Sequence, residues 1–261
     1  LAPLAIALVF FAPQWMFRLT AALLLMIGCW EFHRLAKLNS TATWILYFLQ
    51  AGLIILMYLN WEKINAHAGA ILAASCVAWI VMFLRLFGFR DNQAAGLSYS
   101  TASFASALVA ITSCWFAICW IRDQSHGENL ILLLLIIIWA ADVGAYFSGR
   151  AFGKTKLAPS ISPKKTWEGV VGGILLAGVA ALVVARFAPG IDSPFIPLML
   201  LTAVTVLTSV CGDLFISLHK RTVNLKDAGS LFPGHGGVLD RLDSLLPGSV
   251  FFATGIWILG S

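Results

Sequence analysis

Carboxylates in unusual places are the first feature of this sequence. Only 12 of its 261 residues are Asp or Glu, yet several stand within or beside long apolar segments, where a charged group is costly unless it has a partner. The spacing of Asp213, Ser217 and Lys220 (i, i+4, i+7) predicts a polar stripe on one face of a helix. The carboxylates in question are Asp142, Glu168, Asp213, Asp240 and Asp243.

Basic and glycine-rich loops adjoin these carboxylates. The loops 148–165 and 219–241 are the longest, and the second contains 232-FPGHGG-237, a turn-rich run able to present backbone N–H groups to an anion. Lys and Arg that bind phosphate oxygens, beside Asp that holds a cation, suit a site for phosphates held by metal ions. We therefore expect Asp213 and Asp240 to bind Mg²⁺, with Asp142 and Asp243 as supporting ligands and a second cation as an open alternative.

Simpler roles remain open for several of these residues. Asp240 could be a helix N-cap, and Asp243 a first-turn acid favoured by the helix dipole. Asp142 could be a buried polar group satisfied by a neighbouring helix. Lys164 and Lys165 are candidates for phosphate binding, but they could also be ordinary topology charges.

The composition assigns the chain to the membrane proteins. Of its residues, 60% are hydrophobic and 11% charged, whereas about a quarter are charged in soluble domains. Continuous apolar runs such as 131-ILLLLIIIWA-140 predict helices rather than barrel strands. We expect an all-α, polytopic integral membrane helix bundle of about nine transmembrane helices. The expected segments are 1–11 (short), 15–30, 43–61, 68–87, 98–120, 130–147, 166–187, 196–218 and 242–259.

The charges of the loops predict the orientation. Most of the 17 Lys and Arg residues fall in one set of alternate loops, which the positive-inside rule places in the cytoplasm. The five carboxylates then lie at the cytoplasmic ends of their helices, around a cytoplasm-facing polar cavity. We expect a single membrane domain over 1–261, with N-terminal helices in 1–129 and the catalytic site in 130–261. The net charge of +5 is explained by topology and an anionic partner at the membrane rather than by nucleic acid.

The segment 217–244, here called the signature segment, reads SLHKRTVNLKDAGSLFPGHGGVLDRLDS. It resembles, position for position, the pattern S-x-[apolar]-K-R-x4-K-D-x-G-x2-[apolar]-P-x-H-G-G-[apolar]-x-D-R-[apolar]-D of the phosphatidate cytidylyltransferases (CDP-diacylglycerol synthases). His219 is the one departure, in a position usually filled by an apolar residue. The upstream run 139-WAADVGAYFSGRAFGKTKLAPSISPKKTWEG-169 resembles the family too. The resemblance is strong over the C-terminal half, whereas the N-terminal helices match only in hydrophobic character.

The resemblance implies a reaction and a set of site residues. The reaction is transfer of a cytidylyl group from CTP to phosphatidate, giving CDP-diacylglycerol and pyrophosphate, in phospholipid biosynthesis at a bacterial-type cytoplasmic (inner) membrane. The expected partners are CTP, phosphatidate and membrane lipid, with no nucleic acid and with a homodimer as an open alternative. The expected catalytic residues are Asp213, Lys220, Arg221, Lys226, Asp227, Asp240, Arg241 and Asp243. The expected substrate-binding residues are Ser162, Lys164, Lys165, Glu168, Ser217, His235, Gly236 and Gly237.

Two rival functions use the same residues differently. A CTP-dependent lipid kinase of the polyprenol type would transfer the γ-phosphate instead, and would release CDP rather than pyrophosphate. A transporter would use the carboxylates as an ion path. The acids gather at one end of the helices rather than at mid-membrane, and no two-fold repeat is visible in the sequence, so the transporter is disfavoured.

Overall fold

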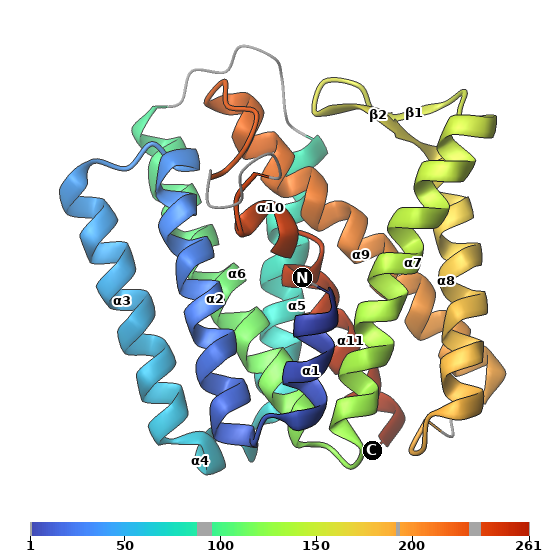
Figure 1. Ribbon diagram of the computed structural model, residues 1–261. Helices are drawn as coiled ribbons and strands as arrows, with labels where there is room; N and C mark the ends of the chain where they lie inside the picture. Colours follow the sequence, from blue (N-terminus) through green and yellow to red (C-terminus); the bar gives the residue numbers. More distant parts are fainter. Residues whose placement is uncertain (1, 88–95, 192–193, 230–235, 261) are drawn as a thin grey trace.

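A bundle of long helices makes up the computed structural model, which describes residues 2–87, 96–191, 194–229 and 236–260 (Figure 1). The long helices are α2 (Gln14–Leu35), α3 (Ser40–Leu59), α5 (Ala68–Phe87), α6 (Leu97–Asp123), α7 (Gly127–Phe152), α8 (Trp167–Phe187), α9 (Phe195–Thr222) and α11 (Leu245–Gly260). Shorter helices are α1 (Ala2–Phe11), α4 (Trp61–Asn65) and α10 (Leu239–Leu242), and the strands are β1 (Lys156–Ala158) and β2 (Ser162–Thr166).

The predicted membrane fold is confirmed. Within the described residues, 8 helical segments are long and apolar enough to cross a membrane, with α10 and α11 forming one of them. The predicted number of about nine included the short segment 1–11, which forms the 10-residue α1 and is not one of these 8. The chain is therefore an all-α, multi-pass membrane protein. The antiparallel hairpin β1–β2 was not expected, and it lies at one end of the bundle beside the end of α7 (Figure 1).

Small residues bring α7 and α8 into backbone contact. A Cβ atom added at Gly144 would lie 2.6 Å from the carbonyl oxygen of Gly172, and one at Gly173 would lie 2.9 Å from that of Ala141. Close approach of this kind is a common way for helices to associate in a membrane, where the hydrophobic effect does not drive helices together and close packing takes its place. The α7–α8 pair therefore holds the hairpin between its two helices in a fixed place.

Replacement of Gly144 by Val tests this packing. We expect overpacking to cost about 1–3 kcal/mol, because the added side chain meets the backbone of Gly172 and the Cβ atom of Leu176, neither of which can rotate away. Thermal unfolding in detergent should show a clearly lower midpoint. Gly52→Val in α3 is the matched control, because a Cβ there meets nothing within 4 Å. Equal midpoints for the two variants would contradict the close contact.

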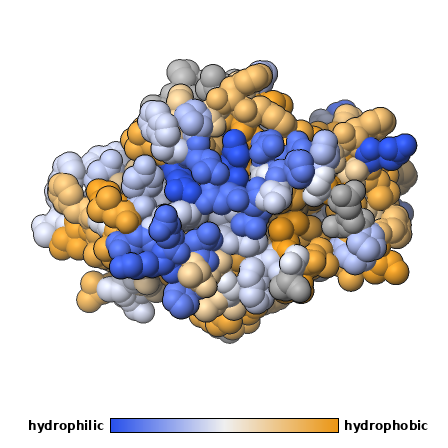
Figure 2. Space-filling view, turned by 90° about the horizontal axis from the view of Figure 1, so that it is seen from below, coloured by the Kyte–Doolittle hydropathy of each residue, from blue (hydrophilic) through white to orange (hydrophobic). Residues whose placement is uncertain are grey.

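The opposite end of the bundle holds a second polar region. Figure 2 views this end and shows hydrophilic side chains gathered across its middle, with hydrophobic ones around them. Arg18 of α2 pairs with Asp123 of α6, and the indole N–H of Trp61 donates to the same carboxylate at 2.6 Å. Arg122 and Glu128 pair at 3.2 Å. These contacts join α2, α4, α6 and α7 far from the hairpin and the signature segment.

Candidate active site

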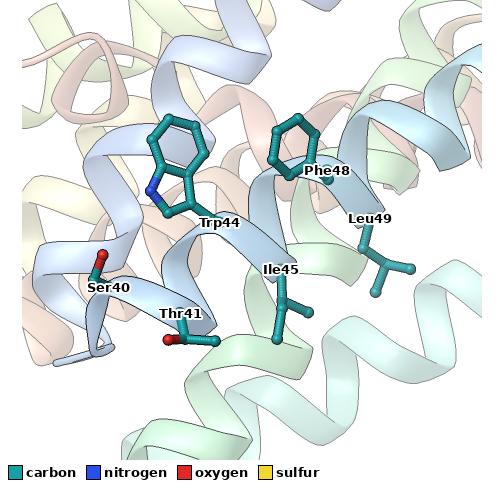
Figure 3. A pocket seen from close by; sticks show the side chains of 6 residues that line it. All are labelled: Ser40, Thr41, Trp44, Ile45, Phe48 and Leu49. Atoms are coloured by element: carbon teal, nitrogen blue, oxygen red, sulfur yellow. The ribbon is translucent and has the colours of Figure 1, made fainter.

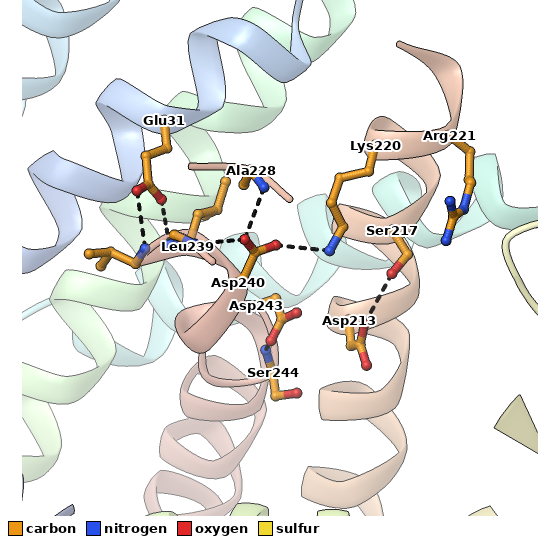
Figure 4. A network of polar contacts seen from close by, with 12 residues as sticks. Glu31, Asp213, Ser217, Lys220, Arg221, Ala228, Leu239, Asp240, Asp243 and Ser244 are labelled. Carbon is orange, nitrogen blue, oxygen red and sulfur yellow. Dashed lines mark hydrogen bonds and ion pairs between the residues drawn. The ribbon is translucent and has the colours of Figure 1, made fainter. Parts of the chain in front are cut away.

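The predicted polar stripe on α9 is present. Ser217 Oγ donates to Asp213 Oδ1 at 3.1 Å, and the side chain of Lys220 leaves the same stretch of α9 (Figure 4). Asp213 Oδ2 forms an ion pair with Lys165 Nζ at 2.6 Å, with the two side chains 32% and 25% exposed. Since Asp213 has no basic neighbour in its own apolar segment, the sequence left a metal cation as its only partner. The structure supplies a lysine from β2 instead.

A cavity of about 200 Å³ opens beside this ion pair. Asp142 lies on its wall and interacts electrostatically with both Lys165 and Asp213. The polar side chains of the wall therefore come from α7, β2, α9 and the α10–α11 junction. Four predicted site residues, from three segments that are far apart in the sequence, meet here. The polar and charged residues of the wall include Asp142, Lys164, Lys165, Asp213 and Ser244.

Two of these carboxylates lie deeper in their helices than the sequence predicted. α7 continues to Phe152, ten residues beyond Asp142, and α9 continues to Thr222, nine residues beyond Asp213. At 1.5 Å per residue these extensions are about 15 and 13 Å long. The expectation that both acids stand at helix ends is therefore wrong. The apolar stretches end there, but the helices continue with polar residues because their hydrogen bonding does not depend on hydrophobicity.

A second polar cluster surrounds Asp240 (Figure 4). Lys220 Nζ pairs with Asp240 Oδ1 at 2.8 Å, and both side chains are largely buried, with 14% and 11% exposed. Asp240 Oδ2 accepts hydrogen bonds from the backbone N–H groups of Ala228 and Gly237, both at 2.9 Å. We call these four residues the Asp240 cluster. Asp240 is not the helix N-cap allowed for above, because it lies within α10 and reaches back to Gly237.

The helical conformation is interrupted between α10 and α11, beside the cavity. Asp243 Oδ1 accepts from the N–H of Ser244 at 2.7 Å, and Pro247 has no N–H to bond the carbonyl of Asp243. A Cβ at Gly212 of α9 would collide with that carbonyl and with the ring of Pro247. The break therefore sits directly against α9, and the Asp243 carboxylate interacts electrostatically with Asp213, Lys165 and Lys220. The predicted helix 242–259 corresponds to α11, and the short α10 precedes it.

Glu31 of α2 is a site-forming residue that the sequence reasoning missed. Its two carboxylate oxygens accept from the N–H groups of Val238 at 3.1 Å and Leu239 at 2.8 Å (Figure 4). The side chain is buried, with 6% exposed. The available signal is an acid inside the apolar run that forms α2, in a half of the chain that resembles the family only in hydrophobic character.

Backbone N–H groups at the end of the glycine turn and directly after it, those of Gly237, Val238 and Leu239, are already used within the protein. Asp240 accepts from Gly237, and Glu31 accepts from Val238 and Leu239. In this arrangement these three N–H groups do not point to an incoming anion, as the turn-rich run had suggested. Gly236 has a φ of +82°, which favours glycine. His235 lies outside the described residues.

The remaining predicted residues lie around these two clusters. Arg221 Nε donates to the carbonyl of Ile161 at 3.1 Å and so fixes the hairpin to α9. Glu168 accepts from the N–H of Thr155 at 3.0 and 3.2 Å and serves the hairpin rather than the cavity. Ser162 is half-buried at the start of β2. Three further residues of the signature segment are exposed near the Asp240 cluster: Lys226, Asp227 and Arg241.

A hollow on the outside of α3 is a different kind of surface. Ser40, Thr41, Trp44, Ile45, Phe48 and Leu49 line it (Figure 3). All six come from one helix, and none is charged. The exposed fractions of 48% for Trp44 and 65% for Phe48 are ordinary for a helix that faces lipid. This surface is therefore not a candidate catalytic site.

The donor set decides where a magnesium ion would fit. In the described part of the chain, no group of three or more His, Cys, Asp and Glu side chains is placed to hold a metal ion. Mg²⁺ needs only one or two carboxylates when substrate phosphates and water complete its shell, and Asp142 with Asp213 on the cavity wall supplies that number. Asp240 has Lys220 and two N–H groups on its oxygens, just as Asp213 has Lys165 and Ser217, so these contacts do not choose between the two as metal ligands.

Comparison with known proteins agrees with this geometry. The sequence matches the cytidylyltransferase family over residues 1–259. The phosphatidate cytidylyltransferase of Haemophilus influenzae is 34% identical over 265 residues, which cover 95% of this chain and 91% of that protein. That of Pseudomonas aeruginosa is 31% identical over 263 residues, covering 100% and 94%. That of Bacillus subtilis is 42% identical over 141 residues, which cover 54% of this chain.

Both halves of the bundle are therefore covered by the similarity, including α2 with Glu31. The residues that meet at the cavity and in the Asp240 cluster come from the segments that carried the resemblance in the sequence. A multi-pass membrane protein that brings lysines and carboxylates together around one cavity has a charge pattern that suits a nucleotide and an anionic lipid. The chain belongs to the cytidylyltransferase family, the family of the phosphatidate cytidylyltransferases, and is a nucleotidyltransferase.

Proposed function

We propose that the protein transfers the cytidylyl group of CTP to phosphatidate, giving CDP-diacylglycerol and pyrophosphate. The observation that carries this proposal is the cavity, whose wall holds Lys164 and Lys165 together with Asp142 and Asp213. Relatives named phosphatidate cytidylyltransferase, similar over nearly the whole chain, support the same reaction. A lipid substrate also accounts for a polar site built into a membrane bundle.

The reaction requires the two substrates to be positioned, and it does not require a strong general base. A phosphate monoester has a second pKa near about 6 and is largely a dianion at neutral pH. Its oxygen attacks the α-phosphorus of CTP, a new P–O bond forms, and the bond to the β-phosphate breaks, so that pyrophosphate leaves with the bonding electrons. The protein must reduce the repulsion between two polyanions and hold them in line. Lys164, Lys165 and Lys220 are the cations placed for this task.

Magnesium is part of the proposal. A Mg²⁺ ion held by Asp213 and Asp142 would supply positive charge to the triphosphate. Lys165, which pairs with Asp213 at 2.6 Å, then has two roles: it holds the carboxylate in place, and it offers its ammonium group to phosphate oxygens when substrate binds. Ser217 keeps the other oxygen of Asp213 oriented through its hydrogen bond at 3.1 Å.

We further propose a bacterial-type inner membrane with the site facing the cytoplasm. Helix order puts the hairpin and the signature segment at the same end of the bundle (Figure 1). The loops at that end carry most of the basic residues, which favours the cytoplasmic side. CTP is supplied from that side, so the orientation and the proposed substrate are consistent.

Product analysis tests the reaction directly. Purified protein with Mg²⁺, phosphatidate and CTP labelled at the α-phosphate should give a labelled lipid, whereas CTP labelled at the γ-phosphate should give labelled pyrophosphate and unlabelled lipid. The α-phosphate is retained because the bond to the β-phosphate is the one that breaks. A lipid labelled from the γ-phosphate, with release of CDP, would establish a kinase instead. Omission of phosphatidate is the control.

A further inference from the structure

We propose that Glu31 is a positioning residue of the active site, which fixes the Asp240 cluster from the N-terminal half of the chain. Its carboxylate binds the N–H groups of Val238 and Leu239, which directly precede Asp240. The inference rests on the proposed function, because it assigns a role in that reaction to a residue outside the signature segment.

The three residues that form this contact are all buried. Glu31 is 6% exposed, Val238 4% and Leu239 0%. Buried backbone N–H groups need acceptors, and the first N–H groups of a helix have none within it. Among the described residues, the ion pairs join Arg18, Arg122, Lys165 and Lys220 to acids other than Glu31. Within the described part of the chain, the N–H groups of Val238 and Leu239 are the hydrogen-bond donors to the Glu31 carboxylate.

Two glycines of the signature segment make room for this carboxylate. A Cβ atom added at Gly229 would collide with Glu31 Oε1 and Cδ, and one added at Gly237 would collide with Oε2 and Cδ. Both contacts lie at the backbone donors of Asp240: Gly229 directly follows Ala228, and Gly237 is itself the second donor. Glu31 can therefore occupy this position only because residues 229 and 237 are glycines.

The neighbouring residues of α2 hold the other half of the Asp240 cluster. The ring of Phe32 lies 5.2 Å from that of His219, which directly precedes Lys220 on α9. One turn later, the carbonyl of Leu35 accepts a hydrogen bond from Tyr99 at 2.7 Å. The end of α2 therefore contacts the elements that carry both Asp240 and Lys220. A shift of Glu31 changes the geometry of their ion pair without removing any charge from it.

Replacement of Glu31 by Gln tests the proposal. A Gln side chain has one acceptor oxygen and presents an NH₂ group to the second N–H, so α10 loses a partner. We expect kcat per folded molecule to fall about 10- to 100-fold, the size of effect that a misplacement of about 1 Å produces. The KM for CTP should change much less, because the lysines of the cavity are untouched. Glu62→Gln, an exposed acid in α4, is the matched control and should keep wild-type kcat.

A second pair of variants separates positioning from simple loss of folding. Gly229→Ala, with Glu31 intact, should lower kcat because the new methyl group displaces the carboxylate. In a Glu31→Ala background the space is free, so Gly229→Ala should cause no further loss of kcat and no further drop in thermal midpoint. Additive effects of the two changes, or wild-type kcat in folded Glu31→Gln, would overturn the proposal. The midpoints are independent of substrate, so a wild-type protein that makes no CDP-lipid would refute the proposed function while leaving the contact itself measurable.

Discussion

Replacing Asp213 by Asn is expected to lower turnover by at least about 100-fold, the usual size of the effect when one preorganised electrostatic group is lost from an active site. Asp213 stands on the cavity wall, and its two oxygens are oriented by Lys165 at 2.6 Å and Ser217 at 3.1 Å. Asn keeps the shape of the side chain but loses the charge that would hold a cation next to the triphosphate. Turnover of purified variant with saturating CTP and Mg²⁺ is the measurement.

A double variant shows whether the charge acts on the substrate or only on Lys165. If Asp213 served merely to pair with the lysine, then Lys165→Met combined with Asp213→Asn would recover much of the activity, since neither charge is left without its partner. We expect the double variant to be at least as inactive as the worse single variant, because both groups face the cavity. The thermal midpoint should change little, since the pair is partly exposed and exposed ion pairs contribute about 0–1 kcal/mol.

The membrane fold was predictable because it depends on local composition. Each apolar run after the short segment 1–11 forms a helix of membrane-spanning length, so the existence and order of these helices follow from the sequence one segment at a time. Helix ends were harder to place. α7 and α9 continue with polar residues beyond the end of their apolar stretches. The interruption between α10 and α11 depends on Pro247 together with the close approach of Gly212 from α9.

The site was predictable only where the sequence pattern is dense. Asp213, Ser217 and Lys220 share one helix, so their common face follows from spacing. The pairing of Lys165 with Asp213 joins a hairpin to a helix 48 residues later in the chain, and no local rule supplies it. Glu31 is 207 residues from the first N–H group that it binds. An isolated acid in an apolar helix indicates that a partner exists, but the identity of the partner is a property of the folded bundle.

Asp240→Asn is expected to abolish most turnover and also to destabilise the protein. The carboxylate is the shared acceptor for Lys220 Nζ and for the N–H groups of Ala228 and Gly237. Asn has one acceptor oxygen for these three donors, and its NH₂ group opposes one of them. Removing one partner of a buried ion pair typically costs about 3–5 kcal/mol, so both the thermal midpoint and the turnover should fall strongly.

The dependence on Mg²⁺ distinguishes this role from that of a metal ligand, which the sequence had favoured for Asp240. Loss of a ligand would raise the Mg²⁺ concentration needed for half-maximal rate and would leave the thermal midpoint near that of the wild type. Loss of the shared acceptor would lower the midpoint, and excess Mg²⁺ would not restore the rate, because the loop at 226–229 and the start of α10 are no longer held together. Lys220→Met is the matched variant: it removes the lysine's charge but leaves both N–H bonds to Asp240, so its midpoint should fall less than that of Asp240→Asn. A stable Asp240→Asn protein whose rate recovers at high Mg²⁺ would return Asp240 to the metal site and leave Lys220 as its competitor for the same oxygen.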